Sequence, residues 1–232
     1  MSFLIDSYND ADFRNEVKFT HLNVTRDEFV RKLNRSRFMF EEIHKKRWIN
    51  NIYFDSLWLD LYATSIEGVS CRTKVRMRWY GEKFGTISPV IEFKMKRGYK
   101  NVKATFPVGE IKIVNGEHKR HIVEKIMSSK ILPYEIKEAL KNLSPTIANS
   151  YYRSYHLSND KLHRLTIDTS LSFFSFLKSQ NIRGAYNDAN HLLITELKFD
   201  TSNRFTSSIM SDIGNYYRVS QISKYTYGMR YS

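Results

Sequence analysis

The sequence predicts an α+β fold, in which helices pack against the outside of an antiparallel sheet or barrel. Strand-like segments recur along the chain without regular alternation with helices, which is typical of antiparallel rather than parallel sheets. The clearest of them, Arg72–Tyr80 (RTKVRMRWY), alternates cations with apolar side chains. Because successive side chains of a strand point to opposite faces, this strand has one charged face and one apolar face.

The other elements follow from similar patterns. Strands are expected at Phe13–Phe19, Asn50–Asp55, Val69–Tyr80, Val90–Lys96, Tyr151–Leu157, His163–Ser170 and Leu192–Phe199. Residues Tyr80–Ser88 are expected to connect two strands of a hairpin. Helices are expected after Thr25, which has capping-box spacing to Glu28, and at Glu117–Ser129, Pro133–Leu143 and Asn203–Ser220.

Composition sets the class of protein. The 232 residues fit a single domain, 1–232, and 41% hydrophobic with 14% aromatic residues can form a sizeable core. The net charge of +13, with a pI near 9.7, indicates an anionic partner: nucleic acid, phosphate compounds or an acidic membrane surface.

Compartment signals are few. Cys71 is the single cysteine, so an internal disulfide cannot form, and we expect it to be a small buried residue. The N-terminus lacks a basic region followed by an apolar stretch, and the apolar run Leu171–Leu177 is too short to span a bilayer. These observations predict a cytoplasmic protein.

The same alternation test gives several other strands a charged face. Its members are Arg14, Glu16, Lys18, Lys74, Arg76, Arg78, Glu92, Lys94, Lys96, Arg153, Arg164, Asp168, Glu196 and Lys198. A half-buried sheet with a solvated polar face would explain any one strand. The set as a whole favours a closed barrel with the polar face turned inward, because long cations dominate it and like charges on neighbouring strands repel.

A cationic lumen requires a dense anion to fill it, since buried unpaired charges are costly. A chain of phosphates is such an anion, and Arg and Lys form charge-assisted hydrogen bonds with its oxygens. The carboxylates on the same face suggest a divalent ion, because Mg²⁺ and Mn²⁺ are typically held by one or two carboxylates plus substrate phosphates. Together these groups are the equipment of phosphoryl transfer.

The order of motifs resembles a known family. It runs E-x-K, NNIYFDS, KVRMRWYG, IEFKMKRG, SYYRSY, RLTIDTSLSFF, ITELKFD and ISKYTYG. This order resembles the polyphosphate-polymerase domain of the vacuolar transporter chaperone (VTC) family, which belongs to the triphosphate tunnel metalloenzymes. The resemblance covers nearly the whole chain. It implies an eight-stranded antiparallel tunnel in which the γ-phosphoryl group of ATP is transferred to a growing polyphosphate chain with Mn²⁺, Mg²⁺ or a similar ion.

Carried over by motif, the resemblance assigns roles to individual residues. The residues expected to act in catalysis are Lys18, Arg76, Arg78, Lys94, Arg153 and Lys198. The residues expected to bind substrate are Lys103, Arg164, Ser223 and Lys224, to which the charged face adds Lys74 and Lys96. Glu196 matches the metal-ligating glutamate, and Glu16 and Glu92 are further metal candidates.

Some residues depart from the family pattern. Ala104 and Thr105 follow Lys103, where family members often have another basic residue. The first strand has Arg14-x-Glu16-x-Lys18 instead of the E-x-E-x-K of the related CYTH phosphatases, which argues against a typical CYTH hydrolase. The inositol-phosphate-sensing domain and membrane helices of the fungal proteins are not in this sequence, so a membrane partner is expected to be a separate protein.

Three functions stay open at this point. The first is a polyphosphate polymerase, whose expected partners are ATP or another nucleoside triphosphate and polyphosphate, but not nucleic acid. The second is a tunnel-fold hydrolase in which water is the acceptor. The third is a non-catalytic subunit that binds polyphosphate. His118 and His121 are expected at a solvated helix start rather than at a metal site, and Trp79 is expected in the core.

Overall fold

The computed structural model describes residues 14–98, 100–183, 187–200, 218–220 and 222–231. A ten-stranded antiparallel sheet dominates it, with the strand order β12-β1-β11-β9-β8-β2-β3-β5-β6 and β10 paired to β9. Its eight long strands are β1 (Arg14–Leu22), β2 (Glu41–Asp55), β3 (Cys71–Tyr80), β5 (Val90–Arg97), β6 (Lys100–Pro107), β8 (Ser144–Leu157), β9 (His163–Ser175) and β11 (Leu192–Asp200). The α+β class and the antiparallel sheet are therefore confirmed.

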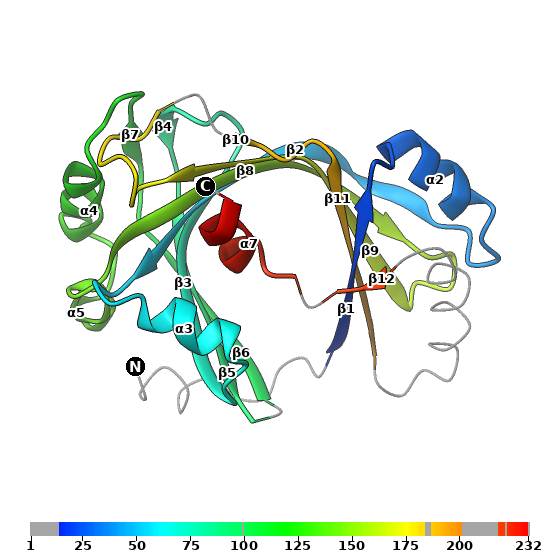
Figure 1. Ribbon diagram of the computed structural model, residues 1–232, viewed down its shortest axis with the longest axis horizontal. Helices are drawn as coiled ribbons and strands as arrows, with labels where there is room; N and C mark the ends of the chain where they lie inside the picture. Colours follow the sequence, from blue (N-terminus) through cyan, green and yellow to red (C-terminus); the bar gives the residue numbers. More distant parts are fainter. Residues whose placement is uncertain (1–13, 99, 184–186, 201–217, 221, 232) are drawn as a thin grey trace.

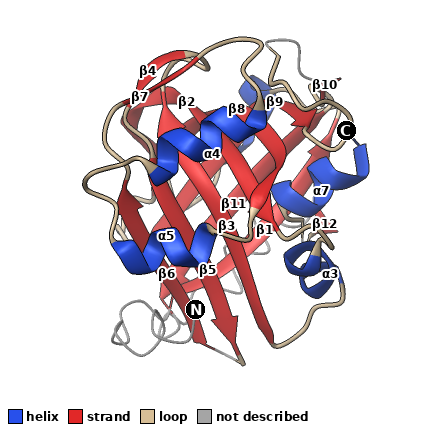
Figure 2. Ribbon diagram, turned by 90° about the vertical axis from the view of Figure 1, so that its left-hand side faces the viewer, coloured by secondary structure: helices blue, strands red, loops and turns tan. Residues whose placement is uncertain are grey.

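The remaining elements are short. Strands β10 (Asn187–Asp188) and β12 (Arg218–Val219) extend the main sheet, and β4 (Gly85–Ile87) pairs with β7 (Ile111–Ile113) in a small second sheet. The helices are α2 (Arg26–Asn34), α3 (Asp60–Ile66), α4 (Lys119–Met127), α5 (Tyr134–Leu140) and α7 (Lys224–Tyr231). Figure 2 shows α4 and α5 lying across one face of the sheet.

The largest apolar core lies between the sheet and helices α4 and α5. On β3, the side chains of Val75, Met77 and Trp79 are at most 1% exposed. They pack in one cluster with Ile122 of α4 and Ile136 of α5. The apolar face that the alternation predicted is therefore the outer face of the sheet, and the charged face is the inner one.

A second core lies under α2. The capping box predicted at its start is present, because the Thr25 hydroxyl accepts from the backbone N–H of Glu28 and the Glu28 carboxylate accepts from the backbone N–H of Thr25. Helix α2 buries Phe29 and Leu33 against apolar residues of the sheet, Phe19 among them. Figure 1 shows α2 at the opposite end of the molecule from α4 and α5.

The sheet curls into an arch (Figure 1), and ion pairs such as Arg76–Glu92 and Lys198–Glu196 lie on its inner face. Strands β1 and β5 lie toward opposite ends of the strand order, yet Lys94 Nζ on β5 is 3.6 Å from Glu16 Oε2 on β1. This ion pair requires the inner faces of the two ends to approach each other. The barrel differs from the expected one in its closure: within the described ranges no ladder joins β6 to β1 or β12, and side chains instead span the gap.

Several predicted bounds are too short. Strand β2 begins at Glu41 rather than Asn50, since its first half is exposed and lacks the apolar alternation that marks a half-buried strand. Strand β9 continues to Ser175 rather than ending at Ser170, because its last residues are buried as a continuous run. Strand β6 and helix α3 were not predicted. Most of the predicted helix Asn203–Ser220 lies outside the described residues, and Arg218–Val219 is strand.

The predicted hairpin and the helices after it are confirmed. Strands β3 and β5 pair antiparallel, so the segment from Tyr80 connects them. Helix α4 starts after His118, and α5 starts after Pro133. Within the ranges described, no helix combines the length and apolar character needed to cross a bilayer.

Candidate phosphate-binding tunnel

The cations of β3 point into the interior of the arch, called the lumen below. The Arg76 guanidinium contacts Glu92 of β5, and Arg78 Nε donates to Asn51 Oδ1 of β2 at 2.9 Å. The outward alternation of Val75 and Met77 leaves these arginines no other face. The row of cations on β3 is therefore a lumenal wall and not a solvated surface.

Glu92 anchors three of the predicted cations. Arg76 donates Nε to its Oε2 at 2.7 Å, Lys103 Nζ is 2.8 Å from Oε1, and Arg78 Nη1 is 3.6 Å from the same oxygen. Burial alone would raise the pKa of Glu92, but Arg76, Arg78 and Lys103 together lower it to about 2. The carboxylate is thus ionised, and both of its oxygens face cations. This geometry favours an anchoring role for Glu92 over metal ligation.

Asp168 holds a second pair of cations. Arg153 donates Nε to Oδ1 at 2.6 Å and Nη2 to Oδ2 at 2.7 Å, which is a bidentate pair. Lys224 Nζ, from α7, lies 2.6 Å from Oδ2. Burial opposes ionisation of Asp168, but Arg153 and Lys224 keep its pKa below the usual range. Asp168 was seen on the charged face but was not assigned to the site, because its two partners are distant in sequence.

Strands β1 and β11 contribute a square of alternating charges. Glu16 lies opposite Lys198 in the register, and Lys18 lies opposite Glu196. Lys198 Nζ is 3.1 Å from Glu196 Oε1 and 3.8 Å from Glu16 Oε2, so one ammonium approaches both carboxylates.

The charges of this square stabilise one another. Burial raises the pKa of Glu196, but nearby cations, with Arg153 and Lys18 the strongest, hold it well below its usual value. Burial likewise lowers the pKa of Lys18, which Glu16 and Glu196 nevertheless raise above normal. Both members of the Lys18–Glu196 pair are therefore charged at neutral pH.

Lys74 differs from these paired groups. It donates to Ser223 Oγ at 3.0 Å and forms no ion pair with the described residues. Burial lowers its pKa, and the nearby cations Lys18 and Lys94 lower it further, to about 7. Lys74 is thus a lumenal amine whose charged form an approaching anion would stabilise.

The other predicted substrate-binding residues share the lumenal face. Lys96 lies opposite Arg72 on β3, and Arg164 lies opposite Lys198 on β11. Lys103 lies opposite Lys94. Thr105, one of the two uncharged residues that follow Lys103, lies opposite Glu92. The lumenal cations outnumber the carboxylates: Lys18, Lys74, Arg76, Arg78, Lys94, Lys103, Arg153, Lys198 and Lys224 surround Glu16, Glu92, Asp168 and Glu196.

Tyrosines and amides line the lumen between the charges. The hydroxyl of Tyr53 accepts from Arg76 Nη1 at 3.3 Å, and that of Tyr151 accepts from Arg78 Nη2 at 3.3 Å. Although burial would raise the pKa of Tyr151, Arg153 and Arg78 lower it. The sequence did not indicate a site role for these tyrosines, because a tyrosine in a strand is usually a packing residue.

Helix α7 lies inside the arch (Figure 1) and supplies the predicted Ser223 and Lys224 region from within. Its Tyr225 stacks on Tyr53 with ring centroids 5.0 Å apart, and the Tyr225 hydroxyl donates to the buried carboxylate of Asp55. That carboxylate also accepts from the backbone N–H of Leu61 at 2.9 Å and of Tyr62 at 2.8 Å. Asp55 thus fixes α7 against β2 and α3.

The donor set for a divalent ion is small. The described residues contain no group of three or more His, Cys, Asp or Glu side chains arranged to hold a metal. Glu16 and Glu196 both lie near the Lys198 ammonium, so two carboxylates already share one cation. Such a pair fits Mg²⁺ or Mn²⁺ when phosphate oxygens complete the coordination, which is how these ions are usually bound.

The remaining sequence expectations concern residues outside the lumen. His118 caps α4, where its ring accepts from the backbone N–H of Arg120, and His121 follows in the first turn, as expected of a helix start. Trp79 is buried as expected. The expectation for Cys71 is wrong: it is exposed, because it begins β3 at the edge of the apolar core.

Comparison with known families places the chain. The family model described as the VTC domain matches residues 9–232. The chain belongs to the VTC domain family. This VTC domain has no match among the curated proteins.

Solved structures with a similar course of the backbone share little sequence identity with this VTC domain. One is a candidate adenylate cyclase from Vibrio parahaemolyticus, with 9% identity, 93% of this chain and 97% of that chain covered, and a TM-score of 0.48. Another is a candidate adenylyl cyclase from Hippeastrum described as having a dominant triphosphatase activity, with 14% identity, coverages of 94% and 96%, and a TM-score of 0.47. A chain of the Schizosaccharomyces pombe Mediator head module follows at 9% identity, with coverages of 89% and 96% and a TM-score of 0.47.

Proposed function

We propose that this VTC domain is a polyphosphate polymerase, which transfers the γ-phosphoryl group of ATP to the end of a polyphosphate chain held in the lumen. The observation that carries the proposal is the excess of cations over carboxylates along the inner face, where Lys74 has no acidic partner among the described residues. An anion with repeated charges would satisfy such a face. Membership of the VTC domain family supports the same choice of substrate.

The lumenal side chains would act by binding and orienting phosphates. Arg76 and Arg78 on β3 and Arg153 on β8 approach the lumen from neighbouring parts of the sheet, and each is already held by a carboxylate, amide or hydroxyl. Their donors are therefore fixed before the substrate arrives, which is the condition for electrostatic stabilisation of a transition state. Lys94 and Lys198 extend this wall from the opposite ends of the sheet.

The reaction needs no protein nucleophile. A terminal oxygen of the polyphosphate chain forms a bond to the γ-phosphorus while the bond to the bridging oxygen of the β-phosphate breaks, and ADP leaves with that oxygen. Glu196 and Glu16 would hold Mn²⁺ or Mg²⁺ together with phosphate oxygens, and such an ion supplies neutralisation of phosphate charge. Arg76, Arg78 and Arg153 keep the two reacting groups together despite their like charge.

The test is incubation with ATP and Mn²⁺, followed by a gel stained for polyphosphate and a parallel assay of free phosphate. We expect metal-dependent chains from the wild type. We expect about 10²–10³-fold less product from Glu196→Gln and from Lys94→Ala, the loss typical of removing one group that stabilises the transition state. Lys141→Ala, an exposed cation after α5, is the matched control and should retain activity.

The other outcomes identify the alternatives. Free phosphate without chains would contradict the polymerase and indicate a hydrolase, in which water replaces the chain end as acceptor. The absence of both products, with retained binding of polyphosphate, would indicate a non-catalytic binding subunit. Equal activity in wild type and Glu196→Gln would contradict the role given to Glu196.

A further inference from the structure

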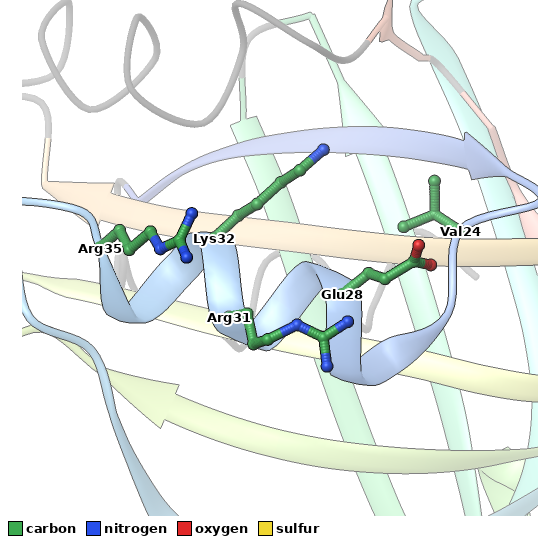
Figure 3. A pocket seen from close by; sticks show the side chains of 5 residues that line it. All are labelled: Val24, Glu28, Arg31, Lys32 and Arg35. Carbon is green, nitrogen blue, oxygen red and sulfur yellow. The ribbon is translucent and has the colours of Figure 1, made fainter.

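A second group of cations lies outside the lumen, on helix α2. The side chains of Arg31, Lys32 and Arg35 line a hollow of 190 Å³ together with Val24 and Glu28. Figure 3 shows the three cations projecting from neighbouring turns of the helix, with Glu28 the single acid among the lining residues. The hollow is thus strongly positive.

The two arginines of this hollow differ from the lumenal cations in their partners. The Glu28 carboxylate is engaged at the helix start, where it accepts from the backbone N–H and the hydroxyl of Thr25, both at 2.8 Å. Arg31 and Arg35 form no ion pair with the described residues. A single cation would complement the negative end of the helix dipole, so the dipole does not account for the whole group.

Arg47 lies on the lumenal face of β2, where it is opposite Arg153 of β8 in the register. Its guanidinium lies 4.1 Å from the ring centroid of Tyr80 and 5.0 Å from that of Tyr155, and its Nε donates to the Tyr155 hydroxyl at 3.0 Å. Tyr80 continues the lumenal face of β3 beyond Arg78, and Tyr155 continues that of β8 beyond Arg153. Because Arg47 is exposed and its register partner Arg153 is largely buried, the lumenal face reaches solvent at Arg47.

Contacts link this opening to α2. Lys46 and Arg47 line a second hollow, of 480 Å³, together with the exposed Trp48. Lys46 Nζ is 3.8 Å from Glu42 Oε2, and Arg26 Nη2, at the start of α2, is 2.9 Å from the same oxygen. Glu42 thus joins Lys46 of β2 to Arg26 of α2, so the start of the helix lies beside the cations of β2.

We propose that these residues form a surface track that binds the polyphosphate chain outside the lumen, which rests on the function proposed above. The α2–β2 track consists of Arg26, Arg31, Lys32, Arg35, Lys46 and Arg47. A linear polyanion suits a row of cations because each phosphate repeats the same charge-assisted contact. Continuity with the lumen favours polyphosphate over another polyanion, since one chain could occupy both surfaces.

The test compares long-chain polyphosphate with tripolyphosphate in equilibrium binding at several salt concentrations. The track variant is Arg31→Glu with Arg35→Glu. The control variant is Lys112→Glu with Lys130→Glu, two exposed cations on the side of β7 and α4 that change the net charge by the same amount. Thermal unfolding of both variants verifies that they are folded.

We expect the track variant to bind long-chain polyphosphate roughly tenfold more weakly than the control, with a shallower salt dependence. We expect tripolyphosphate, with three phosphates, to occupy the lumen alone, so its affinity should be the same in both variants. Equal affinities of the two variants for the long chain would overturn the track. Single-stranded DNA that displaces the long chain as well as unlabelled polyphosphate does would overturn the choice of ligand.

The track and the proposed function can fail separately. If the wild type makes no polyphosphate but the track variant still binds long chains more weakly than the control, the track stands and the polymerase does not. If the wild type polymerises and both variants bind long chains alike, the polymerase stands and the track does not.

Discussion

On β3, Val75, Met77 and Trp79 point outward into a close-packed apolar core, whereas Lys74 and Arg76 point into a lumen where cations outnumber carboxylates. The outer face has its partners within the chain, so it contributes stability. The lumenal face leaves charge that its own carboxylates do not neutralise. The difference teaches that a single strand can serve the fold with one face and a ligand with the other.

The largest effect should come from the outer face. Trp79→Ala removes a side chain that is 1% exposed and leaves a cavity beneath α4 and α5, so we expect a loss of about 3–5 kcal/mol in the free energy of unfolding. Denaturant unfolding measures it. A loss below about 1 kcal/mol would contradict the assignment of this face to the core.

Glu92→Gln separates anchoring from metal binding. The amide would keep the shape of the side chain but leave Arg76 and Arg78 without the buried charge between them, so we expect a loss of about 3 kcal/mol in the free energy of unfolding. Denaturant unfolding measures this loss. The Mn²⁺ concentration for half-maximal activity should not change. A higher Mn²⁺ concentration for half-maximal activity, with unchanged stability, would instead make Glu92 a metal ligand.

Lys74→Met should stabilise the ligand-free protein by roughly 1 kcal/mol, because it removes repulsion at a site suited to a ligand rather than to the fold. The pKa of Lys74 is about 7 in the folded state, whereas its ordinary value is 10.5. Between pH 7 and pH 10.5 the folded state therefore binds fewer protons at Lys74 than the unfolded state does. Wild-type stability should therefore gain a contribution as pH rises from 7 toward 10.5, and Lys74→Met should lack it. Denaturant unfolding at several pH values measures both effects, and a destabilised variant would contradict this account.

The smallest effect is a proton taken up on binding. At pH 8 the Lys74 amine is mostly neutral, and an approaching triphosphate raises its pKa, so tripolyphosphate binding should take up a fraction of a proton. Calorimetry in two buffers of different ionisation enthalpy measures this uptake. Lys74→Arg, which stays charged, should bind without this contribution to the uptake, and equal uptake in both proteins would exclude Lys74 as its source.

The two faces were predictable from the sequence because alternation is local. The period of two along β3 and β5 identified Arg76, Arg78 and Lys94 as members of one face, and the structure brings these residues to one lumen. The capping box of α2 was predictable for the same reason. Local geometry fixes both patterns, whatever the rest of the chain does.

Long-range partners were not predictable. Asp55 and Tyr225 are far apart in sequence, and nothing near either residue indicates their contact. Helix α7 is rich in residues with low helix propensity, and it forms because it packs in the lumen. Its Gly228 allows that approach, since a Cβ there would lie 2.6 Å from the ring of Phe173. Tertiary packing outweighs local preference here.

The central claim is that the inward charged face is a phosphate-binding tunnel. A crystal structure of the protein grown with tripolyphosphate tests it most directly. The account predicts phosphates in the lumen, within hydrogen-bonding distance of Arg76, Arg78 and Arg153, and Lys74 contacting one of them. An empty lumen at saturating tripolyphosphate, or phosphates bound only on the outer surface, would contradict it.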